Sequence, residues 1–259
     1  MLERLGRATI RRAEEASYAF GFFAQVMRES ILFFRRRQVG FKVLVMQILF
    51  TGVEALRISA VLAVAIGAAI NLIGSSLLAE FGQSKLMYSL LIIVITRELG
   101  PLLTAFIVIA RSGTAIATEL GGMVVAHEIE AYVAVGVNPI SYLAAPRLLG
   151  VVASMLTLDV YFNLFGLAGS FAVVQLIKPI AFDEYFRNLL EVLGAGDLLM
   201  GLLKSLVFGV IIAVASLYRG FAVERASTEV PVAGIRAVGS SFMLCIVADV
   251  LLTAMQYLG

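Results

Sequence analysis

The sequence has little charge. Of its 259 residues, only 15% are Asp, Glu, Lys or Arg, whereas 61% are hydrophobic, and the mean hydropathy is +0.98. Soluble domains carry about 25% charged residues, so this composition excludes a soluble globular protein and indicates an integral membrane protein. The apolar runs are continuous and do not alternate with polar residues, which favours membrane-spanning helices over a membrane barrel.

Cysteine and histidine are also scarce, with one residue of each type, Cys245 and His127. One cysteine cannot form a disulfide within the chain, and one histidine without a Cys/His cluster does not make a zinc or iron site. We therefore expect no metal and no cofactor in this chain. The sequence also lacks a GxxxxGK[ST] phosphate-binding loop and a GxSxG nucleophile motif. These absences argue against a self-contained enzyme, so any energy must come from an ion gradient or another subunit.

Five hydrophobic stretches are long enough to cross a bilayer, because about 20 helical residues cover its hydrocarbon core. We predict an all-α integral membrane protein with a single transmembrane domain over residues 54–259. The predicted spans are Ile58–Leu78, Leu86–Ala110, Leu148–Ile177, Leu198–Leu217 and Ala237–Tyr257. The apolar segment Val39–Val53 is short and carries Lys42, so it is either an interfacial lead-in to span one or a sixth span.

Residues 1–53 form a separate N-terminal region in this prediction. The first twenty residues contain seven charged side chains, so they lack the uncharged core of a signal peptide, and we expect them to be retained. The later phenylalanines and the run Arg35, Arg36 and Arg37 are typical of an amphipathic helix that lies in the membrane surface. A cytosolic tail is the alternative.

Lys and Arg are distributed unevenly between the two sides that the spans define. Fifteen of them lie on the side of the N-terminus, and four lie on the other side, namely Lys85, Lys178, Arg187 and Lys204. Because cytoplasmic loops carry the excess of positive charge, we predict a cytoplasmic N-terminus and a C-terminus on the outer side. The outer segment 178–197 is acidic and bounded by Pro and Gly, which predicts a short surface helix.

Two opposite charges, Arg97 and Glu98, interrupt the second span near its middle. A charge at that depth costs about 3 kcal/mol, and adjacent helical residues point in different directions, so each side chain needs its own partner or a wet cavity. In one interpretation the pair binds charged residues of other spans and fixes the bundle. Those candidates are Asp159, Lys204 and Asp249. In the other, Arg97 meets an anionic group such as a phosphate in a cavity, beside a kink at Gly100 and Pro101.

Two further polar pairs lie within predicted spans. Asp159 and Asn163 are four residues apart on span three, and Asp249 and Thr253 repeat this spacing on span five. Side chains four residues apart lie on one face of a helix, so both faces are expected to point into the bundle. Hydrogen bonds between helices are the simpler interpretation of these residues.

The predicted cytoplasmic segment 111–147 is too well patterned for a linker. Apolar residues recur at near-helical spacing from Met123 to Val137, with His127, Glu128 and Glu130 between them. This pattern predicts a short amphipathic helix that ends in the turn before residue 140. Because its glutamates would be repelled by anionic headgroups, we expect it to dock onto a protein partner.

Residues 97–147 read RELGPLLTAFIVIARSGTAIATELGGMVVAHEIEAYVAVGVNPISYLAAPR. This run closely resembles the signature region of MlaE-type permeases, the membrane subunits of bacterial ABC systems that move phospholipids between the inner and outer membranes. The family pattern is RE-x-GP-x-LTA, then R-x-G-x-A-x-A-x-ELG-x-M, an acidic helix, and G-x-(D/N)-P before YL-x-x-PR. Residues 217–252 resemble the family's last loop and span, although AVERAS replaces the usual glycine-rich start of that loop. The resemblance extends from about Ile31 onward.

The resemblance implies a homodimer of five-span subunits in the bacterial inner membrane, each with an N-terminal interfacial helix. It implies a non-catalytic permease subunit, with ATP and Mg²⁺ bound by a separate ATPase. It further implies two more partners, a periplasmic lipid-binding MCE-domain protein and a STAS-domain protein bound to the ATPase. It makes segment 119–131 a cytoplasmic coupling helix that docks onto the ATPase. The residues expected to make that contact are Glu119, Leu120, Gly121, Met123, Val125, Glu128, Ile129 and Glu130.

The resemblance also implies a lipid translocation cavity at the dimer interface. Arg97, Glu98 and Leu99 are expected to line it, and Leu78 and Phe81 are expected at its outer mouth, where they would meet acyl chains. A phospholipid has an anionic head and apolar tails, so its path needs a local cation inside an apolar cavity.

Two other functions are compatible with the residues alone. An ion-coupled secondary transporter of lipids or other amphiphiles would use Arg97, Glu98, Asp159 and Asp249 as a charge relay and would need no ATPase. A structural scaffold of a membrane complex would need these charges for stability only. Neither alternative explains the patterned segment 111–147.

Overall fold

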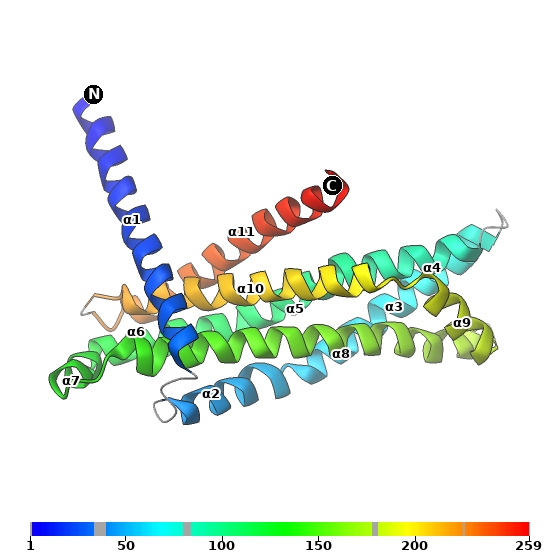
Figure 1. The fold of residues 1–259 in the computed structure, drawn as a ribbon, viewed down its shortest axis with the longest axis horizontal. Coiled ribbons are helices and arrows are strands. Elements are labelled where there is room, and N and C mark those ends of the chain that lie inside the picture. Colours follow the sequence, from blue (N-terminus) through cyan, green and yellow to red (C-terminus); the bar gives the residue numbers. More distant parts are fainter. Residues whose placement is uncertain (1, 34–39, 80–83, 178–180, 225, 259) are drawn as a thin grey trace.

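The computed structural model describes residues 2–33, 40–79, 84–177, 181–224 and 226–258, and all regular elements in these ranges are helical (Figure 1). The all-α prediction is therefore confirmed. The α-helices are α1 (Leu2–Phe33), α2 (Phe41–Ile48), α3 (Leu56–Ala79), α4 (Ser84–Ile92), α5 (Gly100–Val108), α6 (Thr114–Val125), α7 (Glu128–Ala134), α8 (Ala145–Ile177), α9 (Phe182–Val192), α10 (Ala195–Phe221) and α11 (Glu229–Leu258). Wider, π-helical turns form η1 (Leu49–Val53), η2 (Ile93–Leu99), η3 (Ile109–Gly113) and η4 (Ile140–Ala144).

Five helical segments of the described chain are long and apolar enough to cross a membrane, as the hydrophobic pattern predicts. They are Phe41–Gly74, Leu86–Val125, Ile140–Leu176, Ala195–Phe221 and Glu229–Gln256. The first begins at Phe41, so the apolar segment before residue 54 leads into span one, and the described residues contain no sixth span. Spans two and three extend beyond their predicted cytoplasmic ends because the helix continues on both sides of segment 126–139.

Small residues bring the spans into close contact. Gly67 of α3 faces Gly166 and Ser170 of α8, and an added methyl group at Gly67 would overlap the Gly166 carbonyl oxygen. On α10, Gly209 packs against Val152 of α8. Small side chains let helix backbones approach closely, which replaces the hydrophobic driving force that lipid surroundings do not supply. The α8 helix therefore lies at the centre of the bundle, with α3 on one side and α10 on another (Figure 1).

Helix α1 crosses the bundle instead of running along it (Figure 1). Phe22 and Val26 are buried, and the Phe22 ring meets Tyr218 and Phe221 near the end of α10. Glu29 accepts a hydrogen bond from the Ser141 hydroxyl in η4. Helix α1 is therefore attached to one end of the bundle, while the position of the N-terminal region in the membrane surface stays a prediction. Arg35, Arg36 and Arg37 lie outside the described residues.

The segment predicted as one coupling helix over residues 119–131 is divided between two helices. Helix α6 continues span two as far as Val125, and α7 begins at Glu128. His127 between them has φ of +58°, the left-handed conformation that stops an α-helix. The expectation of a single helix is therefore wrong. Periodicity missed the break because the apolar pattern continues across it.

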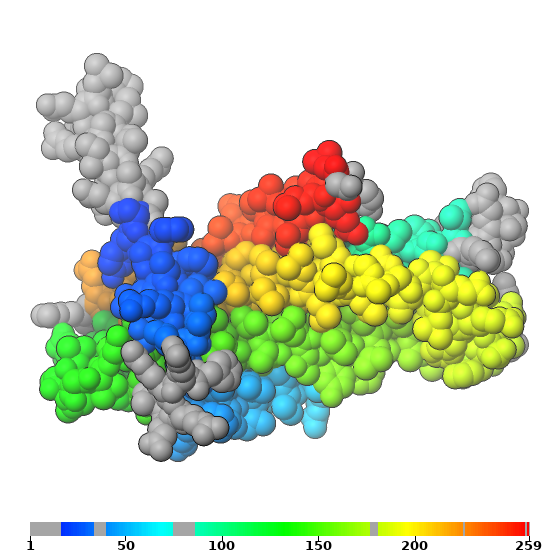
Figure 2. Space-filling model, viewed as in Figure 1, coloured from blue at the N-terminus to red at the C-terminus, as the bar shows by residue number. Residues whose placement is uncertain are grey.

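Helices α9 and α11 complete the fold. The short helix predicted in segment 178–197 is found as α9, and its Tyr185 is buried against the end of α8, where the phenol donates a hydrogen bond to the Leu167 carbonyl at 2.9 Å. Figure 2 shows α11 as a ridge along α10. Only 11% of the most apolar 18-residue stretch of α11 is buried within the chain, so this helix turns most of its apolar surface outward.

Candidate functional site

Arg97 and Glu98 lie in a widened turn of span two. In η2 the Gly100 N–H donates to the Ile95 carbonyl, five residues back, whereas an α-helix would use the carbonyl four residues back. Pro101 contributes to this widening because it has no N–H to donate to the Arg97 carbonyl. The irregularity expected at Gly100 and Pro101 is thus found just before them, at the two charged residues.

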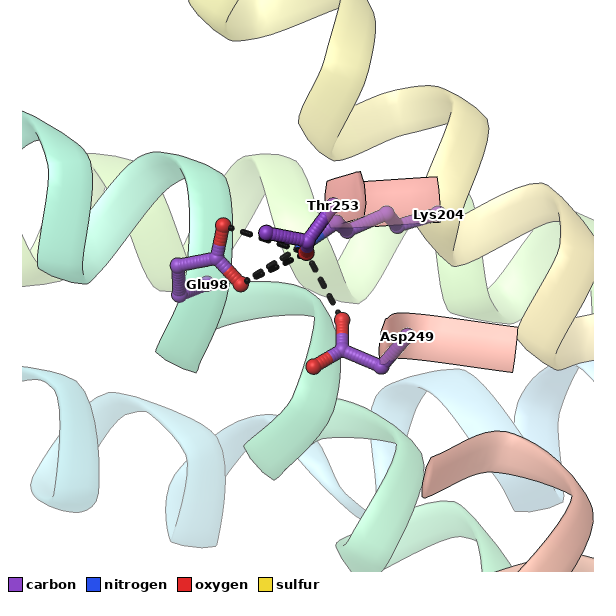
Figure 3. Close-up of polar contacts among 4 residues, drawn as sticks. All are labelled: Glu98, Lys204, Asp249 and Thr253. Atoms are coloured by element: carbon purple, nitrogen blue, oxygen red, sulfur yellow. Dashed lines mark hydrogen bonds and ion pairs between the residues drawn. The ribbon is translucent and has the colours of Figure 1, made fainter. Parts of the chain in front are cut away.

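Glu98 belongs to a buried polar cluster that joins three spans (Figure 3). Lys204 of α10 is completely buried, and its ammonium group contacts Glu98 at 2.6 Å, Asp249 of α11 at 3.0 Å and the Thr253 hydroxyl at 2.8 Å. A lysine ammonium has three N–H donors, and these three oxygens can accept all of them. The interpretation in which Glu98 pairs with a charge on another span is therefore confirmed, and Asp249 and Thr253 share one face, as their spacing predicts.

Arg97 points to a different partner. Its guanidinium lies 3.4 Å from a carboxylate oxygen of Asp197 at the start of α10, and the two side chains keep 14% and 20% of their surface exposed. The other Asp197 oxygen accepts a hydrogen bond from the Gly194 N–H at 3.0 Å, so the first turn of α10 orients this carboxylate. Sequence reasoning missed Asp197 because it lies just outside the predicted span. Its position in the first turn of a predicted helix was the available signal.

Asp159 and Asn163 lie apart from both ion pairs. Both are buried on one face of α8, as predicted, but the Asn163 amide donates to the Asp159 carbonyl of its own helix at 2.9 Å, not to another helix. The Asp159 carboxylate lies against Gly100 and Gly201, whose missing side chains leave room for it. It forms no ion pair with another described residue, so Arg97, Glu98, Asp159 and Asp249 do not form one contiguous relay within the described chain.

The remaining predicted cavity residues are placed as follows. Leu99 follows Glu98 in η2 and is half-buried. Leu78 belongs to α3, and Phe81 lies outside the described residues. The structure therefore brings Arg97, Glu98 and Leu99 into one turn of span two.

The predicted coupling residues differ in how far they can reach a partner. Leu120 and Gly121 are buried in this chain, where Gly121 packs against Val223. Met123, Val125 and Ile129 are half-buried. Glu128 and Glu130 are exposed on α7. The accessible part of the segment is therefore α7 together with the last turn of α6.

Glu119 has a partner that the pattern did not indicate. Its carboxylate is 60% exposed, but it accepts a hydrogen bond at 2.8 Å from Arg147, whose side chain is only 5% exposed. Arg147 also donates to the Leu143 carbonyl at 3.2 Å. Nearby, Arg111 pairs with Glu54 and lies over the ring of Phe50. These pairs tie spans one, two and three to one another at the end of the bundle that carries α7.

Comparison with known proteins identifies the family. The sequence model of the family described as "Permease MlaE" matches residues 44–255. A "Probable ABC transporter permease protein" of Rickettsia bellii is 28% identical over 253 residues, which cover 98% of this chain and 96% of that protein. The "Intermembrane phospholipid transport system permease protein MlaE" of Haemophilus influenzae is 28% identical over 220 residues, 84% of each chain. The chloroplast protein "TRIGALACTOSYLDIACYLGLYCEROL 1" of Arabidopsis thaliana is 27% identical over 180 residues, 70% of this chain and 51% of that protein.

The matched region contains spans two, three and four and all but the outermost residues of spans one and five, together with both charged clusters and segment 119–131. It includes the widened turn at Arg97 and Glu98 and the acidic helix α7, on which the resemblance to known permeases rested. The chain is a multi-pass membrane protein that belongs to the MlaE family of lipid-transport permeases.

Proposed function

We propose that this chain is the membrane subunit of an ABC transporter that moves phospholipids between the inner and outer membranes of a bacterium, driven by a separate ATPase subunit. The names of its relatives support an ABC system and phospholipid cargo. The sequence lacks a phosphate-binding loop, so in this proposal ATP and Mg²⁺ are bound by the partner and the permease itself performs no chemistry.

The observation that carries the proposal is the pair of charged clusters inside an otherwise apolar bundle. Lys204 is fully buried and neutralised by acids of two other spans, whereas Arg97 keeps part of its side chain accessible beside Asp197. A guanidinium binds phosphate oxygens in a bidentate manner. In our proposal a lipid phosphate approaches Arg97 and competes with Asp197, while the Lys204 cluster keeps spans two, four and five together.

The proposed path needs a second subunit. The outward apolar surface of α11 supports a homodimer, because such a surface can be covered by lipid or by a matching helix. We propose the cavity at that dimer interface, with the C-terminus on the periplasmic side beside an MCE-domain lipid-binding partner. The N-terminus, α1 and α7 then lie on the cytoplasmic side, in agreement with the distribution of Lys and Arg.

Coupling to the ATPase is assigned to α7. Its exposed Glu128 and Glu130 offer negative charge to a partner, and a short turn at His127 connects the helix to α6. Movement of the ATPase on binding ATP would be transmitted through α7 into α6 and so into span two, which carries Arg97. A STAS-domain protein would bind to the ATPase and not to this chain.

The lipid role of Arg97 is tested by transport measurements on the reconstituted complex. Arg97→Ala should reduce ATP-dependent transfer of a fluorescent phospholipid at least tenfold, because it removes the guanidinium, while Arg97→Lys should keep part of it. Asp197→Asn is the matched variant, since it keeps the shape of the partner and removes its charge. Full transport by an assembled Arg97→Ala complex would refute the proposed role.

The coupling role is tested by association with the ATPase. Glu128→Lys combined with Glu130→Lys should weaken co-purification of the two subunits, because two negative charges become positive. Glu191→Lys is the control, since Glu191 is an exposed acid on α9 at the opposite end of the bundle. Equal co-purification of all three proteins would count against the assignment of α7. Transport that continues on an ion gradient without an ATPase would instead support a secondary transporter.

A further inference from the structure

A cavity with charged side chains in its lining lies apart from Arg97, which does not line it. It has a volume of about 690 Å³ and is formed between α2, α6 and the beginning of α8. Its lining combines charged and apolar side chains, among them Lys42, Met46, Phe50, Ile116, Glu119 and Arg147. Cavities of this size and mixed character are typical of small-molecule sites.

The cationic side of this cavity is built into the fold. Arg147 is buried, and its guanidinium is oriented by the Leu143 carbonyl and by Glu119. Lys42 is exposed in the first turn of α2. The two cations outnumber the single acid, so the cavity carries one net positive charge. Because most of the Glu119 side chain is exposed, a phosphate can approach Arg147 from the same side.

The apolar side of the cavity faces outward from span one. Met46 and Phe50 are exposed to 59% and 37% in the chain, one helical turn apart on the same face as Lys42. Lys42 stands at the beginning of span one, and Arg147 stands near the beginning of span three. The charges therefore lie at one end of the spans, at the level of headgroups, and the apolar side chains follow toward the acyl region.

From this arrangement we propose that the cavity binds an anionic phospholipid of the leaflet on the side of the N-terminus. Its headgroup phosphate lies beside Lys42 and Arg147, and its acyl chain lies along Met46 and Phe50. Basic pockets between membrane helices on the cytoplasmic side are typical sites for anionic lipids. A free phosphate would contact only the two cations, whereas the apolar side of the cavity needs an acyl chain to cover it. The site is separate from the proposed transport path and does not depend on it.

The test measures lipid binding to the purified full-length chain in detergent by native mass spectrometry. Dioleoyl phosphatidylglycerol and dioleoyl phosphatidylcholine have the same acyl chains and differ in net charge. We expect the anionic lipid to bind more tightly, and Lys42→Gln to weaken its binding about fivefold and that of the zwitterionic lipid less, because choline offsets the charge of the phosphate. Arg57→Gln is the matched control, because Arg57 is exposed on the same span outside the cavity. Glu119→Gln should strengthen binding of the anionic lipid, because it removes the competing carboxylate.

Equal affinity of the two lipids for the natural protein would overturn the proposal, and so would equal effects of the substitutions at Lys42 and Arg57. Inorganic phosphate is added in a separate arm. If it displaces the anionic lipid at equal concentration, the site binds a free anion and the lipid assignment is wrong. These measurements read binding and not transport, so their failure leaves the proposed function standing. Loss of transport by an Arg97 variant likewise leaves this site untouched.

Discussion

The buried ammonium group of Lys204 gives the sharpest test of how the charged residues act. Lys204→Met keeps the length and apolar stem of the side chain and removes its charge. The change leaves Glu98 and Asp249 facing each other as carboxylates without the cation that joins them. Both negative charges are mostly withdrawn from solvent, with 28% and 17% of their side chains exposed.

Removal of one partner from a buried ion pair costs about 3–5 kcal/mol. The residual exposure of Glu98 and Asp249 lets water reach them, so we expect the lower end, about 3 kcal/mol. For a chain of this length such a loss lowers Tm by about 6–12 °C. Scanning fluorimetry of the purified protein in detergent measures this shift, and Lys204→Arg serves as the control that retains the charge.

A triple variant separates charge from packing. Adding Glu98→Gln and Asp249→Asn to Lys204→Met removes the unpaired carboxylates and should recover most of the lost stability, because the penalty comes from uncompensated charge. If Lys204→Met lowers Tm by less than 2 °C, the cluster does not hold the spans together. If the triple variant is no more stable than Lys204→Met, the loss reflects packing and the electrostatic account is wrong.

Three further predictions concern packing and backbone conformation, and each is measured by thermal unfolding. Gly67→Ala should cost about 1–3 kcal/mol, because its methyl group meets the Gly166 carbonyl, whereas Gly122→Ala, with open space around it, should not destabilise the protein; equal Tm values would contradict the close packing of α3 on α8. Tyr185→Phe should cost about 0.5–1.5 kcal/mol, because it removes one buried hydrogen bond while the Ser170 hydroxyl still donates to the Leu167 carbonyl, whereas Tyr161→Phe on an exposed face should cost little. Burial raises the pKa of the Tyr185 phenol above its ordinary value of 10.0. The folded protein therefore holds this proton at pH values where the unfolded chain loses it, and the free energy of unfolding should fall as pH rises above about 10. Tyr185→Phe should reduce this fall with pH. His127→Val should cost about 1–2 kcal/mol and His127→Gly should not, since only glycine adopts a positive φ freely.

Much of this architecture follows from the sequence by elementary rules. Hydrophobic length predicts the five spans, and the cost of an intramembrane charge predicts that Glu98 has a partner on another span, with Lys204 and Asp249 among the candidates. That argument needs only the energetics of charge in lipid. It does not need to know how the helices are arranged.

The arrangement itself decides what the sequence could not predict. Asp197 reaches Arg97 because the first turn of α10 starts at the level of the widened turn η2, and no pattern within either segment encodes that level. The break at His127 depends on one left-handed residue, and an apolar pattern that continues on both sides conceals it. The pairing of Arg147 with Glu119 likewise joins α8 to α6, and it depends on how the chain between these two helices folds back.

The contrast between the fully buried Lys204 and the partly exposed Arg97 connects structure to function. Lys204 is fully buried with an oxygen for each of its N–H groups, so a lipid headgroup could bind it only by breaking contacts that join three spans. Arg97 lies 3.4 Å from an Asp197 carboxylate that is itself partly exposed and also engaged by the Gly194 N–H. In the proposed function, an anionic headgroup would therefore exchange with Asp197 at lower cost. This difference predicts that Lys204 variants lose stability first and Arg97 variants lose transport first, and the reverse order would exclude Arg97 as the headgroup contact.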